Sequence, residues 1–95
     1  MKKYGRTDAN QKRVVQDLRK SGVSVLSLAD IGGGCPDLLV CCAGKLRLFE
    51  VKDGAKSKSR RKLTPDQVEF HKVWPVTVVT SSEDALRAIG VLPWI

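Results

Sequence analysis

The spacing of apolar residues along the chain follows two periods, one typical of helices and one typical of strands. Residues 8–21 predict a first helix, because Val14, Val15 and Leu18 mark one face and Gln11 lies on that face one turn earlier. Asp8 can cap its start, and Gly22 stands where a helix usually ends. A first strand is expected over residues 23–28, before the break at Gly32-Gly33-Gly34.

The second half of the pattern predicts a hairpin followed by a helix, a strand and a helix. The hairpin covers residues 37–52, and its first strand, 37–42, is apolar on both faces, as in a central strand covered on both sides. The next helix opens at Thr64-Pro65 and ends at Trp74-Pro75, a strand covers 76–80, and the last helix runs from Ser81 to Ile89. The order αβββαβα predicts an α/β domain with a mixed central sheet flanked by helices, its last strand pairing parallel to a central one.

Three charged side chains are expected to meet at one end of this hairpin. Glu50 and Lys52 alternate with Val51 on one strand, so their side chains share a face, and Asp37 begins the partner strand. Two carboxylates held close together repel each other and favour a bound cation. Hard divalent cations take oxygen ligands and lower the pKa of water, and a neighbouring lysine can orient or deprotonate that water or stabilise a developing negative charge.

Simpler interpretations exist for each of these residues alone. Asp37 follows Pro36 and could cap a turn, and Glu50 with Lys52 could form a solvated charge pair at a strand end. Leu46 and Leu48 share the face of Glu50, however, and a charged pair at the end of an apolar face indicates the rim of a pocket. Taken together, the three residues therefore favour a catalytic site over a turn cap and a solvated charge pair.

The composition of the chain indicates a polyanionic partner. The 95 residues predict one domain, 1–95, and carry a net charge of +7. Basic side chains gather directly after Lys52, where they are expected to hold phosphates of DNA with little sequence selectivity; they are Lys56, Lys58, Arg60, Arg61 and Lys62. A solvated loop is the alternative for this run.

Cysteine usage and hydropathy narrow the class further. The three cysteines, Cys35, Cys41 and Cys42, contain no Cys-x-x-Cys pair, and His71 is the one histidine of the sequence, so a structural zinc site is not expected. The thiols are interpreted as reduced core residues. No apolar run is long enough to span a membrane, and no apolar signal core follows the basic N-terminus. We expect a cytoplasmic protein without a membrane partner.

The motifs together resemble a known nuclease superfamily. Pro36-Asp37, a hairpin and then Glu50-Val51-Lys52 are similar to the PD-(D/E)XK motif, and Leu63-Thr64-Pro65-Asp66-Gln67 is similar to a segment of its VRR-NUC branch, whose small members are often encoded by phages. The resemblance covers about residues 8–90. It implies a restriction-endonuclease-like core and a Mg²⁺- or Mn²⁺-dependent endonuclease acting on DNA, for which branched and nicked forms are candidate substrates.

The resemblance also implies roles for single residues. Asp37, Glu50 and the carbonyl of Val51 would be metal ligands, Lys52 the catalytic lysine, and Gln67 a supporting site residue. Thr64 and Gln67 also fit a capping box, in which Gln67 would bond only its own helix start. Gln11 stands where the family usually carries a glutamate, unless it pairs with Asp8 in a capping box of the first helix.

Two further expectations concern partners and the rival function. A domain this small covers little DNA, and cutting both strands symmetrically needs two sites, so a homodimer is expected. The rival is a non-catalytic nucleic-acid-binding module on a degenerate nuclease fold, which Gln11 favours because it adds no negative charge to the site. Tight metal-independent DNA binding without cleavage would distinguish it.

Overall fold

The predicted order of elements is confirmed by a computed structural model, which describes residues 9–53 and 62–91. Bounds differ from the expected ones by one or two residues, as is usual at fraying ends. The first half contains α1 (Ala9–Lys20), β1 (Ser24–Ser27), β2 (Leu38–Cys42) and β3 (Lys45–Val51). The second half contains α3 (Pro65–Val73), β4 (Val76–Val79) and α4 (Ser82–Ala88).

The strands form one mixed sheet in the order β1-β2-β3-β4. β1 pairs antiparallel with β2, β2 pairs antiparallel with β3, and β4 lies parallel to β3, as expected for a strand that follows a helix. Leu38 faces Phe49 across the hairpin, and Val51 faces Val79 across the parallel pair. The end of β3 therefore lies between the start of β2 and the end of β4.

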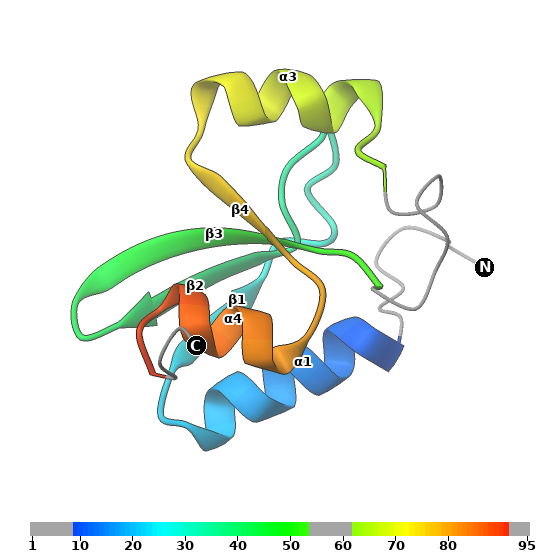
Figure 1. Cartoon of the computed structure of the whole chain (residues 1–95). Helices are drawn as coiled ribbons and strands as arrows, with labels where there is room; N and C mark the ends of the chain where they lie inside the picture. Colours follow the sequence, from blue (N-terminus) through cyan, green and yellow to red (C-terminus); the bar gives the residue numbers. More distant parts are fainter. Residues whose placement is uncertain (1–8, 54–61, 92–95) are drawn as a thin grey trace.

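One face of this sheet carries the hydrophobic core. α1 and α4 lie together against that face (Figure 1). Val14 and Leu18 of α1 are fully enclosed there, next to Phe49 from the sheet and Ala85 from α4. Burial of each large apolar side chain stabilises the fold by about 1.5–3 kcal/mol, so this layer fixes the register of β2 and β3. The described residues share this core, in line with a single domain.

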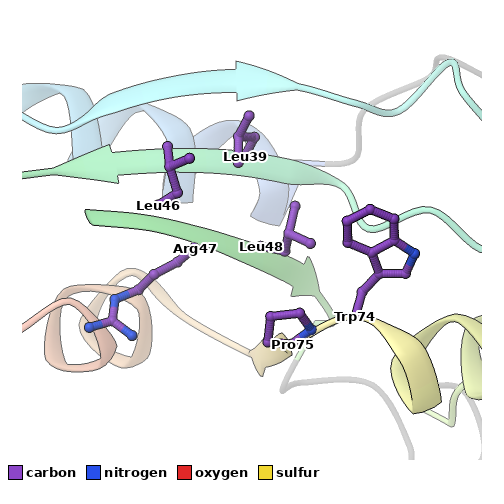
Figure 2. A pocket seen from close by; sticks show the side chains of 6 residues that line it. All are labelled: Leu39, Leu46, Arg47, Leu48, Trp74 and Pro75. Carbon is purple, nitrogen blue, oxygen red and sulfur yellow. The ribbon is translucent and has the colours of Figure 1, made fainter. Parts of the chain in front are cut away.

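The opposite face of the sheet is largely open, and the expectation that residues 37–42 are covered on both sides is wrong for this face. Leu26 is 62% exposed and Leu46 is 68% exposed. α3 lies at one end of the face (Figure 1) and buries none of its own residues. A hollow of about 380 Å³ remains on the face, as Figure 2 shows, lined by Leu39, Leu46, Arg47, Leu48, Trp74 and Pro75.

The helix ends follow the capping signals of the sequence. The Thr64 hydroxyl accepts a bond from the Gln67 amide, and the Ser81 hydroxyl accepts one from the Asp84 amide. Gly22 and Gly90 have positive φ angles of 84° each after α1 and α4, where glycine avoids the strain of a side chain.

None of the helices in residues 9–53 and 62–91 is long and apolar enough to cross a membrane.

The cysteines depart in part from their expected place in the core. All three are free thiols, and each is half-buried rather than enclosed. Cys42 packs against the core cluster, whereas Cys41 belongs to the other face of β2. Cys35 lies in the loop before β2, near the charged end of the hairpin.

Candidate functional site

Asp37 is fixed at the end of β3 by bonds that reach across the sheet. Its own backbone carbonyl accepts a bond of 2.7 Å from the Leu28 amide, which anchors the start of β2 to the end of β1. Its carboxylate oxygen Oδ2 accepts a bond of 2.8 Å from the Val51 amide. This bond runs to β3, so the simpler interpretation of Asp37 as a cap of its own turn does not describe its position.

Glu50 is buried, in contrast to the alternative of a solvated strand end. The residue is 3% exposed, and its Oε2 accepts a bond of 3.0 Å from Gln67 Nε2. The Nζ of Lys52 lies 3.8 Å from the same oxygen. The other oxygen, Oε1, is also buried but has no hydrogen-bond partner among the described residues. An unpaired buried carboxylate oxygen is costly, and a proton or a cation would satisfy it.

The two carboxylates at this end influence each other. The pKa of Glu50 is raised from 4.5 to about 8, mainly by burial and then by the charge of Asp37 and hydrogen bonding with it, while Lys52 acts in the opposite direction. Burial and the negative charge of Asp37 thus outweigh the ammonium of Lys52, which lies 3.8 Å from Glu50. Without a bound cation, Glu50 therefore holds a proton near neutral pH.

Gln67 joins Lys52 to Glu50 from the other side of the site. Its Oε1 accepts a bond of 3.1 Å from Lys52 Nζ, while its Nε2 donates to Glu50. The same Oε1 accepts from the Thr64 amide at 2.9 Å, and the Gln67 amide donates to Thr64 Oγ1 at 3.2 Å. The capping box and the site contact therefore exist together, so the two interpretations of Gln67 do not exclude each other.

Gly34 allows α3 to approach the site this closely. Its φ is 82°, and a Cβ at this position would overlap the backbone of Asp66 in the first turn of α3. A side chain here would push the loop before Asp37 away from α3. The glycine thus maintains the distance between the Asp37 side of the site and Gln67.

Val51 offers its backbone to the same site. Its amide donates to Asp37, and within a strand residue the N–H and C=O point to the same side. The Lys52 amide points the other way, to the Val79 carbonyl at 2.9 Å. The Val51 carbonyl is therefore directed to the side of β3 on which Asp37 lies.

The remaining predicted site residues divide into two groups. Gln11 is buried on α1 at 7% exposed, which agrees with its expected inward position. It lines a hollow of about 290 Å³ whose described lining comes from α1 and β1, rather than from the hairpin end. Of the basic run, Lys62 is exposed before α3, whereas Lys56, Lys58, Arg60 and Arg61 lie outside the described residues, as does Asp8.

One residue of the site has no signal in the sequence. Asn10, in the first turn of α1, donates from Nδ2 to the carbonyls of Lys52 at 3.0 Å and Thr80 at 3.2 Å. Neither a motif nor the helical pattern marks this position, because the contact depends on how α1 crosses the ends of β3 and β4.

The donor set at this end suits a hard divalent cation. In residues 9–53 and 62–91 no group of three His, Cys, Asp or Glu side chains is placed to hold a metal. Mg²⁺ commonly takes only one or two protein carboxylates and keeps several waters. Asp37, Glu50 and the Val51 carbonyl fit this requirement, and the buried, unpartnered Oε1 of Glu50 is the atom that a cation would satisfy.

Searches of protein-family models, curated proteins and solved structures find no match to this chain. The α/β fold and its mixed four-stranded sheet therefore come from the structure itself.

The raised pKa of Glu50 predicts how stability depends on pH in metal-free protein. Between about 4.5 and about 8 the folded state holds a proton that the unfolded state has released, so the free energy of unfolding falls as pH rises through this window. Glu50→Gln removes the titrating group and should flatten the curve, with a gain on the order of 1–3 kcal/mol near pH 8. Denaturant unfolding at a series of pH values, with a chelator present, measures the free energy of unfolding of both proteins.

Glu69→Gln is the matched control for this measurement, because Glu69 is exposed on α3. It should keep the pH dependence of the wild-type protein. Parallel curves for wild type and Glu50→Gln would mean that Glu50 titrates normally, and the buried carboxylate pair would then be wrong.

Proposed function

We propose that this chain is a Mg²⁺- or Mn²⁺-dependent nuclease that hydrolyses DNA phosphodiester bonds, similar to the VRR-NUC branch of the PD-(D/E)XK superfamily. The observation that carries the proposal is the end of β3, where the enclosed Glu50 has an oxygen without a partner beside Asp37 and Lys52. Burial of such a cluster opposes stability, and enclosed carboxylates with strongly shifted pKa values gather at functional sites.

Each residue of the cluster has a chemical role in this proposal. Asp37, Glu50 and the Val51 carbonyl would hold the cation. When bound, that ion supplies Lewis acidity to the scissile phosphate and lowers the pKa of water. Lys52 presents its ammonium where negative charge develops on the phosphate, and Gln67 orients both Lys52 and Glu50 through its two amide atoms.

The expected DNA contact is supported by charge. The net charge of +7 favours a phosphate backbone, and Lys62 is exposed three residues before α3 begins at Pro65. Branched and nicked DNA are candidate substrates beside plain duplex. A cytoplasmic location fits the three free thiols.

The non-catalytic DNA-binding module remains the second candidate because of one observation. Gln11 is buried on α1 and contributes no charge where the resembled family has a glutamate. A module of this kind would bind DNA equally well with and without divalent cations. It would cut none of the structures offered to it.

Cleavage assays separate the two candidates. Labelled duplex, nicked, flapped and four-way DNA are incubated with Mn²⁺ or Mg²⁺, and the wild-type protein is expected to cut at least one of them. Lys52→Ala and Asp37→Ala should lower the cleavage rate by about 100-fold or more, because they remove transition-state charge stabilisation or a metal ligand. Lys72→Ala is the control, since Lys72 is an exposed lysine paired with Glu69.

Retained cleavage in Lys52→Ala would contradict the role of this lysine. Absence of cleavage by wild type on every substrate, with tight binding in a chelator, would establish the binding module instead. DNA binding of each variant is measured by fluorescence anisotropy, so that a loss of affinity is not mistaken for a loss of catalysis.

We also propose a homodimer, supported by the open apolar face of the sheet. Light scattering should give twice the chain mass of 10.4 kDa. Leu46 is 68% exposed in the single chain, so Leu46→Lys should leave the fold intact and yield a monomer if this face is the dimer contact. Gln16→Lys, on the solvent side of α1, is the matched control. A monomeric wild type at working concentration would contradict the homodimer.

A further inference from the structure

The parallel pair β3–β4 ends in an unusual way next to the candidate site. The last ladder partners are Val51 and Val79, and the Lys52 amide still donates to the Val79 carbonyl at 2.9 Å. Beyond that bond, the side-chain amide of Asn10 takes the place of the next backbone hydrogen bond between the two strands. Its Nδ2 donates to the Lys52 carbonyl at 3.0 Å and to the Thr80 carbonyl at 3.2 Å.

This contact fixes the backbone of Lys52 on both sides of its Cα. The amide is held by β4 and the carbonyl by α1, so the point from which the lysine side chain departs has little freedom. A lysine stem has several rotatable bonds, and its ammonium is placed well only when the stem begins at a fixed point. At the far end, Nζ bonds Gln67 at 3.1 Å.

The second acceptor of Asn10 is itself held firmly. Asp84 of α4 accepts bonds from the Thr80 amide at 3.0 Å and from its hydroxyl at 2.6 Å. These bonds lower the pKa of Asp84, which therefore remains an ionised anchor for the end of β4. Asn10 thus ties Lys52 to Thr80, whose own amide and hydroxyl are held by Asp84 of α4.

We propose that Asn10 is a positioning residue, which sets the geometry of Lys52 for catalysis without touching the substrate. The inference rests on the proposed nuclease function. A residue that merely fastened α1 to the sheet would affect the melting temperature, whereas a positioning residue affects the chemical step while the protein is fully folded. Misplacement of a catalytic group by about 1 Å costs on the order of 100-fold in rate.

The test uses two substitutions of different kinds. Asn10→Ala removes the amide, and Asn10→Asp keeps the shape but has no N–H to donate when ionised. With Mn²⁺ and the DNA structure that wild type cuts best, both should lower kcat by about 10–100-fold and change KM by less than about threefold. Gln16→Ala removes a similar side chain from the exposed face of α1 and should behave as wild type.

Melting curves by circular dichroism are used to choose an assay temperature at which every variant is folded. Hydrogen exchange of the Lys52 amide should be faster in both Asn10 variants than in the wild type. An active wild type with an unchanged kcat in Asn10→Ala overturns the positioning role and leaves the nuclease function standing. A rise in KM alone overturns it also, because that would place Asn10 in substrate binding. An inactive wild type is a different failure, that of the proposed function, and the positioning role falls with it.

Discussion

Burial of the Glu50 carboxylate is the constraint on which the rest of the site depends. Strand alternation places Phe49 and Val51 in the core, so Glu50 must point to the opposite face of β3. Most of that face is open, but at this end α3 lies over it and Gln67 meets the carboxylate. The enclosure excludes water, and together with the nearby Asp37 it makes ionisation of Glu50 unfavourable even beside the ammonium of Lys52.

Two helices that are distant in sequence hold the same lysine from opposite ends. Gln67 of α3 bonds the ammonium of Lys52, and Asn10 of α1 bonds its backbone carbonyl. Gly34 allows the first contact by admitting the start of α3, and Asp84 supports the second through Thr80. The arrangement of the helices thus has a direct chemical result, since α1 restrains the backbone of Lys52 and α3 restrains its ammonium.

Local patterns were sufficient to predict the elements and the triad. The hairpin follows from alternation in two adjacent strands, and once it forms, Asp37 must meet the end of β3 that carries Glu50 and Lys52. The capping box of Gln67 was equally visible, because Thr64 and Gln67 are close in sequence.

Features that depend on the packing of whole elements were not predictable in this way. Leu39 and Val40 look alike in sequence, yet Val40 is enclosed and Leu39 lines an open hollow, because α3 covers only one end of its face. Asn10 contacts residues far along the chain, and only the crossing of α1 over the strand ends reveals it. The inward position of Gln11 was predicted from the helical period, but its neighbours were not.

The most direct test of the buried carboxylate pair is calorimetry of Mn²⁺ binding at pH 7 in two buffers with different ionisation enthalpies. Because the pKa of Glu50 is about 8, most molecules should carry a proton on the pair, and binding should release close to one proton per ion. The heat should then differ between the buffers, and the difference should vanish in Glu50→Gln. Binding without proton release, or equal binding by Glu50→Gln and wild type, would contradict the account.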